Sequence, residues 1–273
     1  MIIRHLATWH GNWTVTFASA ELPSGEISSG AAGRTISVYS VDPAGNVSPT
    51  ITHTLDVDTV VRNFSFPAPD LIGATNTGGT DATTLNAVER QAGLPVQGTV
   101  EPGSTVTINV GSWNQTIPAS QTTAGTWAYT IPASALVEGN TASAVISVMA
   151  RDQYGNVTQT LQQTIAVDTM TAATLMPQPV GADNVLTAVE RSAGLTLTGT
   201  AEPGARVHVN FNGVDKAPVT ADVNGNWTVS YASSELPQGE LSSGTAGRTI
   251  TVYSVDAAGN TSATLTHTLD VDT

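Results

Sequence analysis

The chain contains no cysteine, few basic residues and no long hydrophobic run, and each absence excludes a class of protein. Without cysteine, a disulfide-stapled extracellular module is excluded. No apolar run approaches the roughly 18 residues of a membrane-spanning helix, so no membrane insertion is expected. The 9 Lys and Arg residues against 22 Asp and Glu give a net charge of −13. Because nucleic-acid surfaces need a basic stripe, we expect no nucleic-acid partner; the acidic balance suits cation binding or simple solubility.

The sequence also lacks a recognisable catalytic constellation. Its 5 histidines have no recurring serine or carboxylate partner at a motif spacing. Neither a phosphate-binding loop nor a G-x-S-x-G motif occurs. The first residues lack the hydrophobic core and cleavage site of a signal peptide, so a secretion signal would have to lie outside this chain. We therefore expect no enzymatic activity.

What the chain does contain is an internal repeat. Residues 11–59 and 225–273 align without gaps and differ at only 11 of 49 positions, and a more diverged copy lies between them. The Val-Asp-Thr that closes each copy recurs at Asp58, Asp168 and Asp272, at spacings of 110 and 104 residues. Self-similarity on this scale indicates an array of like domains of immunoglobulin size.

Each copy shows the pattern of short β-strands. Residues 195–200, 206–211 and 227–231 alternate apolar and polar side chains between turn residues, and no segment keeps a helical period over three turns. Such alternation is typical of half-buried strands and predicts an all-β sandwich of about seven strands. We therefore assign one recurring aromatic face to the core rather than to a ligand platform; its members are Trp13, Val15 and Phe17, then Trp127, Tyr129 and Ile131, then Trp227, Val229 and Tyr231.

We predict tandem immunoglobulin-like β-sandwich domains in a head-to-tail array, the first of them truncated. The expected domains are a partial repeat at 1–58 and two complete repeats at 59–168 and 169–273. The first copy has no counterpart of residues 195–221, so it should present an open sheet edge and half a core. This organisation suggests an excerpt of a longer repeat protein.

Acidic residues recur at three positions of the repeat. One is the Asp of a D-x-x-G-N hairpin, another is the terminal Asp of Val-Asp-Thr, and the third is the Glu of Ala-Val-Glu-Arg with an Asp upstream. Because the last strand runs away from the hairpin that precedes it, the hairpin Asp and the terminal Asp should lie at opposite ends of a domain. Head-to-tail stacking then predicts two clusters, Asp58 with Asp81, Glu89 and Asp152, and Asp168 with Asp183, Glu190 and Asp256.

Converging carboxylates repel one another unless a cation lies among them. Oxygen ligands without Cys or His favour Ca²⁺, so we expect calcium between the domains. The hairpin Asp also has a simpler interpretation, because an Asp at this place of a tight turn accepts backbone N–H groups. Both interpretations remain open for Asp152 and Asp256, whereas the similar segment 222–226 is taken as a turn only.

Taken in order, the Ala-Val-Glu-Arg, Glu-Pro-Gly, Gly-Asn-Trp, D-x-x-G-N and Val-Asp-Thr segments resemble bacterial immunoglobulin-like repeats. Such repeats build the stalks of giant type-I-secreted adhesins of the biofilm-associated and RTX kind. The resemblance implies calcium at the inter-repeat junctions, held by Asp58, Glu89 and Asp152 and by Asp168, Glu190 and Asp256. It also implies a monomer at the bacterial cell surface, with neighbouring repeats as partners and a host or surface ligand bound by other domains. The half-missing first repeat departs from the family pattern, as does the lack of a C-terminal secretion signal and of nonapeptide calcium repeats.

Two other functions compete with a stalk. The domains could recognise a glycan or a protein through exposed strands or loops. They could also be accessory sandwiches of a secreted polysaccharide-active enzyme.

Overall fold

The computed structural model describes residues 12–27, 34–69, 84–140, 143–176, 180–181, 183–241 and 248–273. Asp81, one of the predicted ligands, lies outside these ranges. Contacts divide the chain into two compact units, one of residues 1–67, 97–128 and 147–162 and one of residues 68–96, 129–146 and 163–273. No helix in the described part of the chain is long and apolar enough to cross a membrane.

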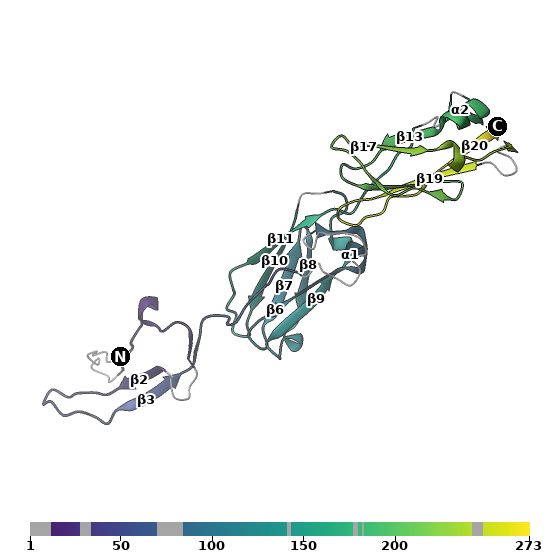
Figure 1. Cartoon of the computed structure of the whole chain (residues 1–273). Helices are drawn as coiled ribbons and strands as arrows, with labels where there is room; N and C mark the ends of the chain where they lie inside the picture. The colour runs from purple at the N-terminus through teal and green to yellow at the C-terminus, as the bar shows by residue number, and fades with distance from the viewer. Residues whose placement is uncertain are drawn as a thin grey trace. The chain divides into compact units, whose positions relative to one another are not determined.

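The first copy keeps two strand pairs of the repeat (Figure 1). Strands β2 and β3 pair antiparallel with Arg34 opposite Leu55, and β1 pairs with β4 so that Glu26 faces Asp58. The C-terminal copy has the same registers, with Arg248 opposite Leu269. The elements are η1 (Ser19–Glu21), β1 (Glu26–Ile27), β2 (Arg34–Val38), β3 (Ile51–Leu55) and β4 (Val57–Asp58).

The middle copy forms two sheets. One has the strand order β5-β11-β10-β7-β8 and the other consists of β6 and β9. Its elements are β5 (Thr84–Leu85), α1 (Ala87–Ala92), β6 (Leu94–Thr99), β7 (Thr105–Val110), β8 (Trp113–Ile117), η2 (Ala119–Gln121), β9 (Thr126–Ile131), η3 (Ala133–Ala135), β10 (Ala144–Arg151) and β11 (Leu161–Val167).

The C-terminal copy repeats this plan. Its larger sheet has the order β12-β20-β19-β14-β15, with β16 on β14 and β18 on β20, and its smaller sheet pairs β13 with β17. The elements are β12 (Val185–Thr187), α2 (Ala188–Ala193), β13 (Leu195–Thr200), β14 (Arg206–Phe211), β15 (Val214–Asp215), β16 (Val219–Thr220), β17 (Asn226–Tyr231), η4 (Ser233–Glu235), β18 (Glu240–Leu241), β19 (Arg248–Val255) and β20 (Leu265–Asp272).

Side chains from both sheets fill one core in this copy. Strand β17 alternates exposed and buried residues as predicted, and Trp227, Val229 and Tyr231 are all at most 5% exposed. The indole ring needs a glycine beneath it, because a Cβ on Gly199 would lie 2.5 Å from Cζ2 of Trp227 and 2.0 Å from the carbonyl oxygen of Thr174. The predicted core face is thus confirmed here, and the alternation of polar and apolar residues explains it.

The prediction of a buried aromatic face is wrong for the first copy. Trp13 is 54% exposed, whereas Trp127 and Trp227 are each 2% exposed. The physical reason is the missing counterpart of β13 and β14, the strands that complete the core around Trp227 in the C-terminal copy. A sheet that lacks its covering strands cannot bury its apolar face.

Two short helices depart from the all-strand expectation. Helices α1 and α2 each begin with a capping box, in which the N-cap side chain and a Glu three residues later satisfy one another's backbone N–H groups. The pairs are Asn86 with Glu89 and Thr187 with Glu190. These six-residue helices are too short to show a helical period in the sequence.

Candidate metal centres at the repeat boundaries

The hairpin aspartates are turn-capping residues. Oδ1 of Asp152 accepts the N–H groups of Tyr154 and Asn156 at 2.9 Å, and its Oδ2 accepts the Asn156 side-chain amide at 2.7 Å. Gly155 takes a positive φ of 96° at the tightest point of the loop. The local sequence therefore fixes the direction of the Asp152 carboxylate before any cation is considered.

At the first boundary this carboxylate meets two others. Asp58 ends β4 and Glu101 follows β6 in a Glu-Pro-Gly turn. One carboxylate oxygen each of Asp58, Glu101 and Asp152 lie within 4.8 Å of one another. Glu101 and Asp152 are each 7% exposed. The Asn156 amide donates to Oδ1 of Asp58 at 2.9 Å, and the N–H of Arg62 donates to Oε2 of Glu101 at 3.0 Å. Three carboxylates from two consecutive repeats thus share one small space.

The second boundary repeats the arrangement with Asp168, Glu202 and Asp256. Asp256 is 6% exposed and caps its hairpin as Asp152 does, by accepting the N–H of Asn260 at 2.8 Å. Burial, and then the charge of Asp256, raise the pKa of Asp168. Burial, followed by the charges of Asp168 and Asp256, raises the pKa of Glu202. The smaller, charge-dependent part of both shifts is the repulsion expected between ionised carboxylates that lie close together.

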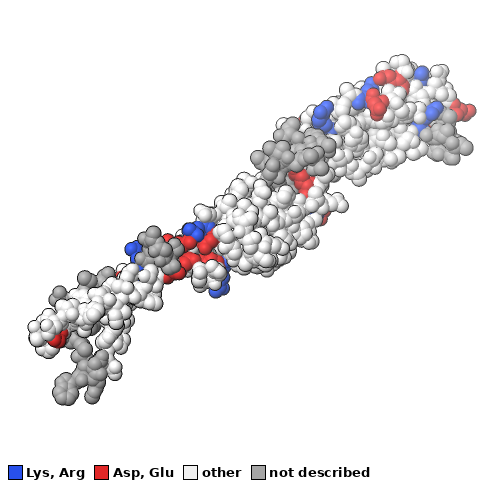
Figure 2. All heavy atoms as spheres, turned by 90° about the horizontal axis from the view of Figure 1, so that it is seen from below, with Lys and Arg blue, Asp and Glu red and all other residues white. Residues whose placement is uncertain are grey.

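The residues present fit a calcium ion. All three side chains of each cluster offer hard oxygen donors, and three carboxylates can supply up to six of the six to eight oxygens that Ca²⁺ takes. Among the described residues, the ion pairs found are Arg62–Glu26, Arg90–Glu138 and Lys216–Glu235, and none of them neutralises a cluster. Figure 2 shows acidic atoms in separate groups on a largely uncharged surface.

The structure corrects the predicted place of Glu89. Strand β5, which precedes its helix, pairs in parallel with the end of β11, and the N–H of Asp168 donates to the carbonyl of Leu85 at 3.0 Å. Glu89 therefore lies at the C-terminal end of its own repeat, and its grouping with Asp58 and Asp152 is wrong. Its Oε2 caps α1, its Oε1 is buried without a hydrogen-bond partner, and burial raises its pKa.

Glu190, like Glu89, lies at the other end of its repeat than predicted. Strand β12 pairs in parallel with the end of β20, with Thr187 opposite Asp272, so Glu190 lies at the end of the repeat opposite Asp256. The prediction that these two share a cluster is wrong. Glu190 does approach Asp183 as predicted, since a Cβ on Gly181 would lie 2.7 Å from Oε1 of Glu190 and 3.2 Å from Oδ1 of Asp183. A metal-binding role for Glu89, Asp183 and Glu190 stays a prediction.

Sequence reasoning missed Glu101 and Glu202. Both stand in a Glu-Pro-Gly that recurs in the two complete copies, a motif that entered the sequence analysis only through the family resemblance. The recurrence of an acidic residue at a turn was the available signal. Its convergence with the other two carboxylates depends on how β6 and β13 leave their sheets, which no local pattern reveals.

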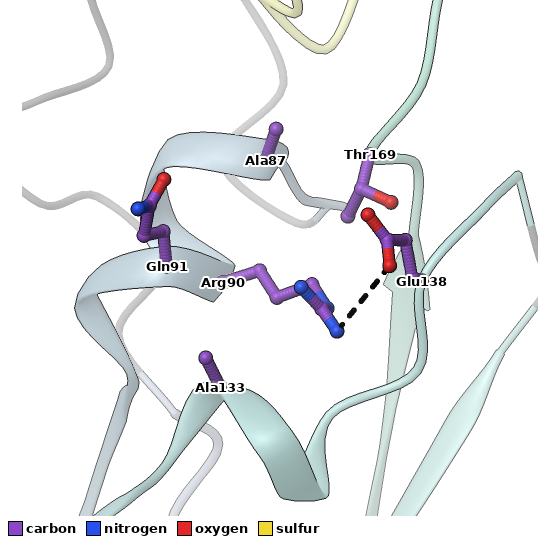
Figure 3. Close-up of a pocket in the computed structure, with 6 residues that line it drawn as sticks. All are labelled: Ala87, Arg90, Gln91, Ala133, Glu138 and Thr169. Carbon is purple, nitrogen blue, oxygen red and sulfur yellow. Dashed lines mark ion pairs between the residues drawn. The ribbon is translucent and has the colours of Figure 1, made fainter.

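A pocket beside α1 is a weaker candidate. It is lined by Ala87, Arg90 and Gln91 of the helix and by Ala133, Glu138 and Thr169, and an ion pair joins Arg90 to Glu138 at 3.7 Å (Figure 3). The Arg90 Nε also donates to the carbonyls of Leu136 and Val137 at 3.1 Å. Arg191 makes the equivalent bonds to Leu236 and Pro237, so this arginine fastens the helix to the next loop.

The match to a known domain family agrees with the immunoglobulin-like architecture of the C-terminal copy. Residues 183–270 match the family model of the bacterial Ig domain. The chain is similar to a Ca²⁺-stabilized adhesin that helps an Antarctic bacterium reach out and bind ice, at 26% identity and a TM-score of 0.42, over 87% of this chain and 56% of that one. It thus spans little more than half of that structure's length. No curated protein matches the chain.

Two further solved structures are similar over much of the chain. A 1.5-MDa bacterial ice-binding adhesin, studied for its retention on the host cell surface, matches at 25% identity and a TM-score of 0.43, over 87% of this chain and 74% of that one. The fibronectin(III)-like modules of Clostridium thermocellum CbhA match at 15% identity and a TM-score of 0.31, over 73% and 92%. The predicted fold class, tandem immunoglobulin-like domains built mostly of β-strands, is confirmed.

Proposed function

Starting from the bacterial Ig domain at residues 183–270, we propose that this chain is a structural spacer of a bacterial cell-surface adhesin, with Ca²⁺ at its repeat boundaries. One observation carries the proposal. The same three carboxylates, a terminal Asp from one repeat with the Glu-Pro-Gly Glu and the hairpin Asp of the next, converge at both boundaries. A carboxylate cluster that recurs at each repeat boundary indicates a feature of the whole array and not a binding site for one ligand.

A cation would act here by joining two repeats. Asp58 and Asp168 each belong to the repeat before the boundary, and the other two ligands of each cluster belong to the repeat after it. An ion that needs oxygens from both sides is bound well only when the two repeats keep one mutual orientation. Extracellular Ca²⁺ modules bind with dissociation constants of about 10⁻⁴–10⁻³ M, so such a boundary would be stiff only where calcium is plentiful, as it is outside the cell.

The proposal assigns the chain no reaction. Its partners are the neighbouring repeats of a longer chain, which would behave as a monomer and present an adhesive domain at a distance from the cell. A directly binding module is the other candidate, but the recurring tryptophans of the two complete repeats are buried at 2% exposure and offer no stacking surface for a sugar.

The test compares the intact chain in EDTA and in millimolar Ca²⁺. We expect calcium to raise the unfolding temperature and to narrow the distribution of particle lengths in small-angle X-ray scattering, while equimolar Mg²⁺ does much less because it keeps its own waters. The decisive comparison is between EDTA and about 10 mM Ca²⁺, a concentration at least about tenfold above the expected dissociation constant. The same unfolding temperature and the same scattering in both buffers would refute the proposal.

A further inference from the structure

At the second boundary one asparagine joins the two repeats without any cation. Nδ2 of Asn260 donates to Oδ2 of Asp256 at 2.8 Å within its own hairpin, and across the boundary to the carbonyl oxygen of Asp168 at 2.9 Å. The same amide lies 3.2 Å from Oδ1 of Asp168. Its Oδ1 accepts the N–H of Ala87 at 2.8 Å. Asn260 is 4% exposed, so water competes little for these bonds.

The Ala87 N–H is a group that needs such a partner. Ala87 is the first residue of α1, and the first N–H groups of a helix have no acceptor inside the helix. The neighbouring N-cap contributes as well, since Nδ2 of Asn86 donates to the carbonyl of Ala258 at 3.2 Å in the same hairpin. The hairpin of the third repeat therefore caps the helix of the second.

The equivalent asparagines of the other hairpins make fewer bonds. Asn46 bonds to Asp42 of its own hairpin through its backbone N–H and its side-chain amide. Asn156 makes the same pair of bonds to Asp152 and adds one to Asp58 at the first boundary. Among the described residues, Asn260 is the one hairpin asparagine that also accepts from a helix of the preceding repeat.

We propose that Asn260 is a metal-independent latch between the second and third repeats. Its amide holds Asp168 and α1 to the hairpin when no cation is bound, and it aims the Asp168 and Asp256 carboxylates at one point when a cation is bound. The inference rests on the proposed spacer function, because it concerns the same boundary. It adds that the two boundaries differ: the second keeps an ordered contact in chelator, whereas Asn156 at the first supplies only one bond across.

The amide hydrogen of Ala87 reports on the latch directly. We would measure amide exchange of the full chain in EDTA by NMR. The Ala87 N–H should exchange at least about tenfold more slowly than that of Ala188, the equivalent first residue of α2, in the same molecule. Asn260→Ala should remove this difference. Asn46→Ala, which loses the equivalent side-chain bond to the Asp of its own hairpin, should leave the exchange of Ala87 unchanged.

A third variant separates the two halves of the amide. Asn260→Asp keeps an acceptor for Ala87 but replaces the donor with a charge that faces Asp168 and Asp256, so Ala87 should lose its protection in EDTA. The latch is refuted if Ala87 and Ala188 exchange alike in the wild-type chain, or if Asn260→Ala leaves Ala87 protected. Because these measurements are made without calcium, they test the latch independently of the calcium proposal. A protected Ala87 in a chain that does not respond to Ca²⁺ would sustain the latch and overturn the calcium proposal.

Discussion

Replacing Glu202 with glutamine should change stability in opposite directions with and without calcium. Glu202 contributes one of three carboxylates whose oxygens lie within 4.8 Å of one another. Two unit charges at that distance repel by about 3.5 kcal/mol at an effective dielectric constant of about 20. Glu202 is only half-buried, and solvent and salt screen much of this repulsion, so we take the net relief in Glu202→Gln as about 1–2 kcal/mol.

The assay is thermal unfolding of the full chain in EDTA and in millimolar Ca²⁺. In EDTA the variant should unfold roughly 5–10 °C above the wild type, since about 1 kcal/mol shifts a domain of this size by 4–8 °C. In Ca²⁺ the order should reverse. At about 10 mM Ca²⁺ a site with a dissociation constant of about 10⁻⁴ M is at roughly 100 dissociation constants, where the wild type gains about 2.7 kcal/mol, and the variant loses most of that gain with its ligand.

Asp222→Asn is the matched control. Asp222 accepts the N–H groups of Asn224 and Asn226 at 2.8 Å, the same turn contacts that the cluster aspartates make, but it belongs to neither cluster. It should lower the unfolding temperature equally in both buffers. If Glu202→Gln behaves like Asp222→Asn, with the same sign in EDTA and in Ca²⁺, then Glu202 is a turn residue and the electrostatic argument fails.

Two other predictions concern pH and packing. Burial raises the pKa of Glu89, and burial with neighbouring charge raises those of Asp168 and Glu202, so the folded chain holds protons that the unfolded chain releases above pH of about 4. The free energy of unfolding in EDTA should therefore fall as pH rises through the raised pKa values, and millimolar Ca²⁺ should flatten that slope. Urea unfolding across pH 4–7 measures both effects. A free energy of unfolding that rises with pH in EDTA contradicts the argument. Gly199→Ala should destabilise the C-terminal repeat by about 3 kcal/mol or more, because its Cβ would meet Trp227 and a backbone oxygen. The control Thr196→Ala, at an exposed position, should cost about 0.5 kcal/mol. Equal losses of unfolding free energy, measured by denaturant titration, would contradict the packing argument.

The alternation of apolar and polar side chains along the strands could be predicted from the sequence because it is a local property. A residue two positions along a strand lies on the same face whatever the rest of the chain does, so 195–200 and 206–211 were identified with the bounds that the structure has. The position of the hairpin Asp relative to the terminal Asp followed from antiparallel pairing alone. Asp58 with Asp152, and Asp168 with Asp256, do converge.

The two helices and the third carboxylate of each cluster were not predicted, and the reasons differ. The capping boxes that begin at Asn86 and Thr187 could have been recognised, because Asn-x-x-Glu and Thr-x-x-Glu are local signals. We assigned those glutamates to the wrong end of the repeat instead. The pairing of β5 with β11 and of β12 with β20 is parallel and joins segments about 80 residues apart, so no local pattern sets which end of the sandwich receives Glu89 or Glu190.

The sequence by itself determined the repeat, the strands, the turn residues and two of the three acids at each boundary, since these follow from period, alternation and chain direction. The tertiary structure alone decided that Glu101 and Glu202 complete the clusters, that Glu89 and Glu190 cap helices, and that Asn260 spans a boundary. Those roles depend on which loops meet when two sheets pack and one repeat meets the next. Contact across such distances is a property of the folded chain, and identical short motifs can take different partners in different copies.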